Sequence, residues 1–270
     1  MPVRQDREAG RSNRDDRRQN QYSMDVPGYF VSAWGTRQHH GSCPLYDGTG
    51  PDTACQKDRP RNRGFPFDYD ILFYGPGEIS SFRSVIDDIS GYKHSLAEYI
   101  SSGRILIAVG TTVALFGEKI VRWAPENDKN DVIDGLCIIN TEAYERELVY
   151  GNDLDIRAEY GGYSMELIGS QIQMADYGFT ENDQFKRFGS VIYGRGNNGS
   201  DGIEGAVHVN SIFTNMLGPV LVNNPWLTVR IIRTAAEVKG LEISKRDPEF
   251  TLERKSMKLK KQFIESKMNS

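Results

Sequence analysis

One turn in this chain has the pattern that carries a nucleophile in many enzymes, yet it holds no reactive side chain. In the stretch Arg104 to Gly117 (RILIAVGTTVALFG), an apolar run ends at Gly110, two threonines follow, and a second apolar run closes at Gly117. This pattern predicts a buried strand, a tight turn and the start of a helix. Such a turn lifts one residue above the carboxyl edge of a sheet, where nucleophiles stand in α/β proteins. Because the residue at the tip is Gly110, the expected architecture comes without its nucleophile.

The cysteines and histidines elsewhere offer no pair that spacing supports. Three cysteines fit neither a disulfide framework nor a zinc motif, which indicates a reducing cytoplasm: Cys43, Cys55 and Cys137. We expect Cys137 to lie buried and inert on a strand far from the turn. We expect His208 to be partly exposed in the sheet and His94 to lie on the surface of a helix. No Cys–His pair follows from these positions.

Composition narrows the function classes. The chain has 270 residues, enough for one large α/β domain or two small ones, with 38% hydrophobic residues. Its net charge of −4 and pI near 5.7 do not favour nucleic acid as a partner. No run approaches the roughly 18 apolar residues of a membrane helix, and the charged N-terminus does not resemble a signal peptide. We therefore expect a cytoplasmic protein with no membrane partner, and no cofactor or metal is implied.

The two ends of the chain are expected to lie outside the folded domain. Residues 1–22 contain six arginines and four acids with almost nothing apolar, which predicts a disordered leader. Residues 23–66 form an irregular segment with one strand near Tyr29 to Val31; a metal or thiol site at His39 and His40, beside Ser42 and Cys43, is less favoured than a surface loop. The main domain is expected over residues 67–240, and residues 241–270 form a charged helical tail.

The elements between these ends alternate at first and then become rich in strands. Strands are predicted at Asp70–Tyr74, Arg104–Val109, Leu136–Asn140, Glu147–Tyr150, Ser164–Met174, Ser190–Tyr193 and Ala206–Phe213. Helices are predicted at Ser81–Ser101 with a break near Gly91, from the turn to about Ile120, at Trp226–Lys239 and within Pro248–Met268. Asn224 is expected to cap the third helix, and the glycines of Gly194–Gly202 to adopt positive φ. This order predicts a three-layer α/β sandwich with a mixed sheet.

Three blocks of the sequence resemble a known family. Asp70–Glu78 (DILFYGPGE) is similar to D-x-x-x-F-G-G-G-Q-D, and Ile107–Gly117 (IAVGTTVALFG) to A-V-C-G-G-Y-Q-L-L-G. Tyr193–Pro225 resembles the longer pattern G-Y-G-N-N-G-x-D-G-x-E-G, followed by N, then G-T-Y-L-H-G-P and N-P. These are blocks of class I (triad-type) glutamine amidotransferase domains of the cobyric acid synthase type. Within that family the chain most resembles the glutaminase subunits of lipid II isoglutaminyl synthases.

The resemblance implies a flavodoxin-like fold with a mostly parallel central sheet and an atypical N-terminal unit. It also implies that the catalytic cysteine position is Gly110 and the catalytic histidine position is Leu217, so both groups are replaced. The oxyanion-type loop corresponds to Gly75, Pro76 and Gly77. A second loop, suited to hold a ligand such as a glutamine-like molecule, corresponds to Gly196, Asn197, Asn198, Gly199 and Asp201. We expect Gly75, Gly110, Asn197 and Leu217 to converge near the carboxyl edge of the central strands.

Glutamine hydrolysis needs a thiolate, a histidine base and N–H groups that hold the oxyanion. With the first two replaced, the favoured hypothesis is a pseudoenzyme that acts as a binding or scaffolding subunit beside a Mur-ligase-like synthase subunit. One alternative is a working glutaminase subunit that delivers ammonia to that ligase during peptidoglycan precursor amidation for the cell wall, using an unrecognised nucleophile. Another is a different chemistry in which the Gly196-to-Asp201 loop holds a ligand.

Overall fold

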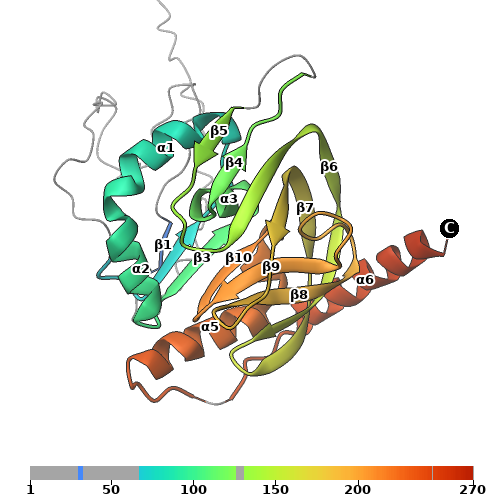
Figure 1. Cartoon of the computed structure of the whole chain (residues 1–270). Coiled ribbons are helices and arrows are strands. Elements are labelled where there is room, and N and C mark those ends of the chain that lie inside the picture. The colour runs from blue at the N-terminus through green and yellow to red at the C-terminus, as the bar shows by residue number, and fades with distance from the viewer. Residues whose placement is uncertain (1–29, 33–66, 126–130, 245, 270) are drawn as a thin grey trace, which may run out of the picture.

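The computed structural model describes residues 30–32, 67–125, 131–244 and 246–269 (Figure 1). The leader predicted over residues 1–22 and the histidine pair at 39–40 lie outside the described residues. No helix in the described part of the chain combines the length and the apolar character that crossing a membrane would take.

Ten strands of the described residues form one mixed sheet. Their order is β1-β2-β3-β10-β9-β8-β6-β4-β5, and β7 pairs with β6 off this path. The strands are β1 (Phe30–Ser32), β2 (Ile71–Tyr74), β3 (Ile105–Val109), β4 (Lys119–Val121), β5 (Val132–Asp134), β6 (Thr141–Tyr160), β7 (Tyr163–Phe179), β8 (Phe185–Tyr193), β9 (Ile203–His208) and β10 (Ser211–Thr214). Strands β1, β2, β3 and β10 run parallel to one another, whereas β10, β9, β8 and β6 are joined antiparallel. Four parallel strands therefore lie together around β3, and one further parallel pair, β4 with β6, lies on the far side of the antiparallel strands.

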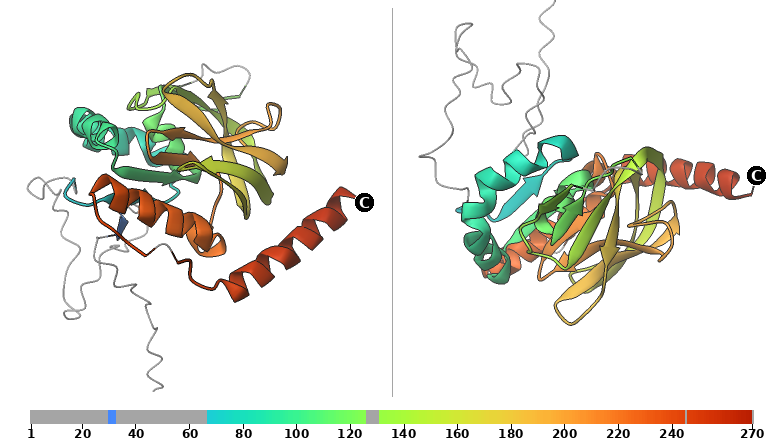
Figure 2. Two further views of the ribbon diagram at one scale, coloured as in Figure 1. Left: turned by 90° about the horizontal axis from the view of Figure 1, so that it is seen from below. Right: turned by 45° about the horizontal axis from the view of Figure 1, so that its top comes forward.

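Helices cover both faces of the parallel half of the sheet. Alternate residues of the strands enter two separate cores: Leu72 and Leu106 pack in one, and Ile71 and Ile105 in the other. The first core is closed by α1 (Phe82–Ile89) and α2 (Lys93–Ser101), and the second by α5 (Pro225–Val238). Figure 2 shows these helices on opposite sides of the sheet. The predicted three-layer α/β class with a mixed sheet is confirmed, as is the helix break near Gly91.

A long antiparallel hairpin, β6 with β7, projects from the sheet (Figure 1). The strand segments predicted at 147–150 and 164–174 are parts of these longer strands. The hairpin closes through Gly161 and Gly162, which both have positive φ, as two-residue turns of this type require. One register shift, between Glu145 and Tyr150, interrupts the pairing.

Two predictions around α3 (Val113–Phe116) were wrong. The helix after the turn ends at Phe116 and does not reach Ile120, because Gly117 passes close to strand β6: a β-carbon on Gly117 would lie 2.3 Å from the carbonyl oxygen of Thr141. Residues 136–140 are not a strand. Their N–H groups instead bond carbonyls at the end of α3, with Leu136 donating to Leu115 and Ile138 to Phe116. Those carbonyls have no partner inside the helix, so the loop supplies one.

The strand predicted from Ala206 to Phe213 is two strands. β9 and β10 form a hairpin in which His208 pairs with Ser211, so the chain reverses at Val209 and Asn210. Val209 has a φ of 55°, which valine rarely adopts, and its type gives no turn signal. The predicted positive φ angles of the Gly194–Gly202 loop are confirmed at its four glycines.

Asn224 occupies the predicted position at the start of α5, but its side chain makes no capping hydrogen bond. Its Oδ1 accepts from the N–H of Ile168 at 2.9 Å, and its Nδ2 donates to the Ile168 carbonyl at 3.0 Å. Asn224 is fully buried, so it ties α5 to strand β7 through a backbone unit. The predicted tail helix is present as α6 (Thr251–Met268).

Candidate functional site

The turn after β3 has the geometry of a nucleophile elbow. All five residues of β3 are buried, and the strand passes directly into a short 3-10 turn, residues 110–112, and then into α3. Gly110 has a φ of 64°, a left-handed conformation that is strained for residues with a side chain. Enzymes that carry a nucleophile at this position accept that strain in order to expose it. Here the conformation is kept while the side chain is absent.

Leu217 occupies the space in front of Gly110. A β-carbon placed on Gly110 would lie 2.7 Å from Leu217 Cδ2 and 3.2 Å from Pro76 Cβ. The structure therefore brings together the two positions that the resemblance assigns to the cysteine and the histidine, although they are far apart in the sequence. Leu217 is held there by its N–H, which donates to the Ser170 carbonyl of β7 at 2.7 Å.

The Gly75-Pro76-Gly77 loop reaches the same turn. Thr111 Oγ1 donates to the carbonyl of Gly77 and accepts from the Gly77 N–H at 2.9 Å. An oxyanion-holding loop needs N–H groups that point at the reacting atom. The Gly77 N–H instead bonds a neighbouring side chain, so the loop is fastened to the turn through this donor.

Tyr177 on β7 supports the turn from below and was not singled out by the sequence analysis. Its hydroxyl donates to the Gly110 carbonyl at 3.3 Å, and its backbone N–H donates to the Asn197 carbonyl at 2.9 Å. Burial raises the pKa of the Tyr177 hydroxyl above its ordinary value, so the group stays a protonated donor. A tyrosine in an alternating strand carries no sequence signal that would separate this role from core packing.

The Gly196-to-Asp201 loop folds its polar side chains inward. Asn198 Oδ1 accepts from the backbone N–H groups of Ser200 (2.9 Å) and Asp201 (3.2 Å), and Asn198 Nδ2 donates to an Asp201 oxygen at 2.7 Å. Asp201 also accepts from the Ile203 N–H at 2.9 Å. These bonds shape the loop itself, so its predicted ligand-holding side chains, Asn198 and Asp201, are engaged within it. Gly196 and Gly199 supply the positive φ angles of the loop.

Asn197 links this loop to the neighbouring strands. Its side-chain oxygen accepts from the Gly205 N–H at 2.8 Å and from Asn215 Nδ2 at 3.2 Å. Gln173 on β7 donates to the Asn197 carbonyl at 2.6 Å, and Gln171 donates to that of Gly196 at the same distance. The two glutamines are buried, and their spacing two apart among apolar neighbours is the signal by which inward-facing polar residues of a strand can be found.

Glu204 is the buried carboxyl group of the site, and it too was missed. Its Oε1 accepts from the Thr214 hydroxyl and from the Asn215 N–H, the latter at 2.8 Å. Burial raises the pKa of Glu204 to about 7, against the lowering effect of these hydrogen bonds. Through its hydrogen bonds with Thr214 and Asn215, Glu204 holds the segment that leads from β10 to Leu217.

Cys137 does not lie where it was expected. It is exposed in the loop after β5 and has a φ of 50°. Its backbone N–H donates to the Gly117 carbonyl, just beyond the end of α3, and this bond fixes the residue in the loop. It lines an open cleft of about 410 Å³ together with His94 and His208. His94 is exposed on α2, as predicted, and His208 is half-buried at the end of β9, with Nδ1 3.1 Å from the Gln184 carbonyl oxygen. Among the described residues, no group of three or more histidine, cysteine, aspartate or glutamate side chains is placed to hold a metal ion.

The comparisons agree with the family that the motifs suggested. A search of family models finds none that matches the sequence. Two curated relatives carry the same name, lipid II isoglutaminyl synthase (glutamine-hydrolyzing) subunit GatD. The one from Streptococcus pneumoniae is 28% identical over 174 residues, covering 63% of this chain and 63% of the relative. The one from Staphylococcus aureus is 26% identical over 181 residues, covering 66% of this chain and 69% of the relative. The chain thus spans less than two thirds of the length of the pneumococcal relative.

Among solved structures, one described as a glutamine amidotransferase aligns with 64% of this chain and 80% of its own length, with 13% identity and a TM-score of 0.36. The similarity to the GatD subunits confirms the predicted resemblance to a glutamine amidotransferase-like domain.

Proposed function

We propose that this chain is a glutamine amidotransferase-like subunit that does not hydrolyse glutamine and that acts by binding a partner. The observation that supports the proposal is the contact between Gly110 and Leu217. The fold keeps the strained turn on which a nucleophile would stand, and an apolar side chain fills the position in front of it.

Three groups that glutamine hydrolysis requires are missing or already engaged at this turn. Glycine offers no thiolate to attack the amide, and leucine offers no nitrogen to accept and return a proton. The Gly77 N–H already donates to Thr111. Covalent catalysis by an activated thiolate contributes many orders of magnitude to such rates, and binding alone does not replace it.

The proposed role is that of a scaffolding subunit in a hetero-oligomer. The relatives are named as subunits of a glutamine-hydrolysing lipid II isoglutaminyl synthase, and this supports a cytoplasmic partner of the Mur-ligase-like type in peptidoglycan precursor amidation. In this role the hydrogen bonds of Asn197 and Glu204 keep the loop and the segment after β10 in place without any reactive side chain.

One observation favours a second candidate, a glutaminase that uses another nucleophile. Cys137 is exposed and shares its cleft with His94 and His208, so a thiol and two imidazoles line one surface. Cysteine proteases and amidases use a thiol–imidazole pair of this chemical kind. A glutaminase of this kind would deliver ammonia to the synthase subunit from the Cys137 cleft.

Ammonia release from glutamine separates the two candidates. We expect the full chain, alone and with the Mur-ligase-like subunit, to release no ammonia above background and to resist labelling by a glutamine-mimicking electrophile near Gly110. The Cys137→Ser variant serves as the control. Turnover by the unmodified chain that disappears in Cys137→Ser would replace the inactive subunit with the second candidate.

A further inference from the structure

The C-terminal helix α6 carries an apolar face that the rest of the described chain leaves exposed. Leu252, Leu259 and Phe263 are 76%, 63% and 54% exposed. They stand seven and four residues apart along the helix, so the helical period places them on one side. Figure 1 shows α6 extending past the β6–β7 hairpin towards the C-terminus. We call these three residues the α6 stripe.

A different side of α6 holds the helix on the domain. Ile264 is buried, and Lys260 Nζ donates to the Gly169 carbonyl at 3.1 Å. Lys261 pairs with Glu166 at 2.5 Å and Lys267 with Asp153 at 3.1 Å. Within the described residues Leu252 and Leu259 take no part in this attachment, and Phe263 contributes only its ring face, over which Lys267 Nζ lies 4.4 Å from the ring centre.

The charges of α6 indicate the kind of surface that would cover the stripe. The helix contains six basic and two acidic residues, a net charge of +4 in a chain of net charge −4. Lys255 lies one helical turn from both Leu252 and Leu259, and Lys258 follows on the same flank. Both lysines are exposed, and neither forms an ion pair within the described residues. An apolar stripe beside unpaired cations fits a groove with an apolar floor and carboxylates along one rim.

We propose that the α6 stripe is the docking surface for the partner subunit, which receives α6 in an acid-rimmed apolar groove. This inference rests on the proposed function, because it takes the chain to be a subunit of a larger complex. The location agrees with that role. Lys260 bonds Gly169, whose neighbour Ser170 accepts the hydrogen bond from Leu217, so a partner seated on α6 lies beside the strand that borders the turn.

Other occupants fit the charges less well. A second copy of α6 would bring Lys255 and Lys258 against like charges, which opposes pairing. The leader, residues 1–22, carries six arginines against four acids and has the same sign. An anionic lipid surface would compete for Lys260, Lys261 and Lys267, which Asp153 and Glu166 already engage.

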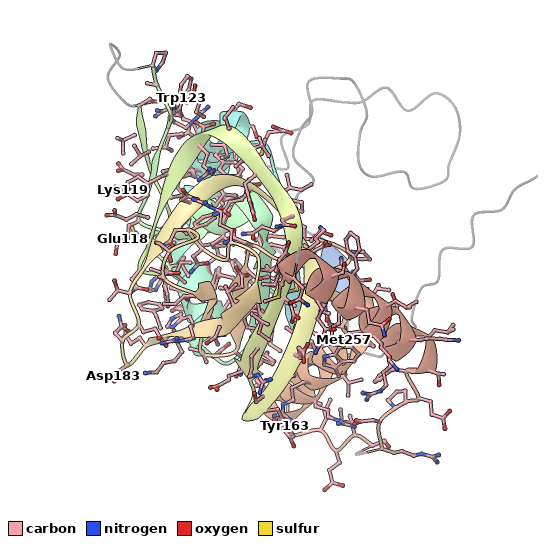
Figure 3. The ribbon with its side chains drawn as sticks, turned by 90° about the vertical axis from the view of Figure 1, so that its right-hand side faces the viewer. Glu118, Lys119, Trp123, Tyr163, Asp183 and Met257 are labelled. Atoms are coloured by element: carbon pink, nitrogen blue, oxygen red, sulfur yellow. The ribbon has the colours of Figure 1, made fainter. Side chains whose placement is uncertain are left out.

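The test measures binding of the full-length chain to the Mur-ligase-like subunit from the same organism. Leu259→Glu with Phe263→Glu should weaken the complex at least tenfold, because two anchors lose their apolar contact and meet carboxylates. Lys255→Glu should weaken it several-fold at low salt and less at high salt. Val132→Glu is the matched control: Val132 is 47% exposed on β5, which pairs with β4, and Figure 3 shows Lys119 and Trp123 of that region opposite Met257 of α6.

Each outcome of this experiment either supports or overturns the proposed docking surface. The docking surface is overturned if the wild-type complex forms and the double variant Leu259→Glu with Phe263→Glu binds as tightly. It is also overturned if Val132→Glu weakens the complex equally. In both cases the proposed function still stands. A wild-type chain that forms no complex with the subunit overturns both. The α6 stripe would belong to another occupant if these variants abolished self-association, or binding to phosphatidylglycerol vesicles, while binding to the subunit persisted. Unchanged thermal unfolding of each variant, expected because the side chains are exposed, shows that the fold is intact.

Discussion

At the scale of single residues, the turn at Gly110 joins two constraints that are separable by mutation. Its left-handed φ disfavours a β-carbon, and Leu217 lies where that carbon would go. We expect Gly110→Ala to lower the free energy of unfolding by about 1–3 kcal/mol, the usual cost of such strained backbone. In the double variant Gly110→Ala with Leu217→Ala, the steric contact with Leu217 should be relieved, whereas the backbone strain at residue 110 should remain. Gly75→Ala is the control, because an added β-carbon there meets nothing within 4 Å. Urea unfolding measures these free energies. Equal losses of stability in Gly110→Ala and Gly75→Ala would contradict the assignment of strain to Gly110.

Glu204 makes the stability of the site depend on pH. Its pKa is raised by burial from the ordinary 4.5 to about 7, so the folded state binds the proton more tightly than the unfolded state. The folded form is therefore favoured at low pH, and this contribution is lost as the pH rises from about 4.5 through 7, by on the order of 3 kcal/mol. Glu204→Gln should flatten this part of the stability profile, whereas Glu78→Gln, on the exposed loop, should leave it unchanged. A wild-type slope that survives in Glu204→Gln would show that other groups produce it.

At the scale of elements, the hairpin of β9 and β10 contains an unfavourable residue at its turn. Val209 has a φ of 55° and is 48% exposed, so its β-branched side chain is strained and packs little. We expect Val209→Asn to stabilise the fold by about 1 kcal/mol, since asparagine tolerates this conformation. Val207→Asn, on the strand two residues earlier, should destabilise it. Thermal unfolding of the two variants measures the difference, and a loss of stability in Val209→Asn would mean that the valine makes a contact worth more than its strain.

The same hairpin shows where sequence reasoning stops. Periodicity and glycine placement were sufficient for β2, β3, α1, α2 and the Gly194–Gly202 loop, because these features are local. They failed at Val209, whose type contradicts its conformation, and at residues 136–140, which bond the end of α3 in place of a strand. The proximity of Gly110 and Leu217 came from a family resemblance and not from periodicity. Tyr177 and Glu204 were missed because their role depends on which distant backbone atoms they meet.

At the scale of the whole molecule, the last helices are held on by different forces. α5 buries Leu227 and Ile231 against the sheet, whereas α6 buries Ile264 and is held mainly by polar contacts: the lysine pairs with Asp153 and Glu166, the bond from Lys260 to the Gly169 carbonyl, and Arg254 over the Trp226 ring. Partial burial raises the pKa of Asp153, but hydrogen bonds from Lys267 and Lys260 outweigh this and leave it below its ordinary value. The charged form of Asp153 thus favours attachment of α6, and this contribution is lost as the pH falls through the lowered pKa.

Salt should therefore release α6 before any other part of the described fold. We expect amide hydrogen exchange in α6 to quicken when sodium chloride is raised to about 1 M, because ion pairs near the surface are screened over a few ångströms at that concentration. Exchange in α5 should change little or slow, since high salt does not weaken apolar burial. Asp153→Asn, which removes the acceptor shared by Lys260 and Lys267, should produce the same fast exchange in α6 at low salt. Equal protection of α5 and α6 at both salt concentrations would mean that Ile264 and its neighbours hold the helix, and that the ion pairs contribute little to the way this chain presents its C-terminal helix.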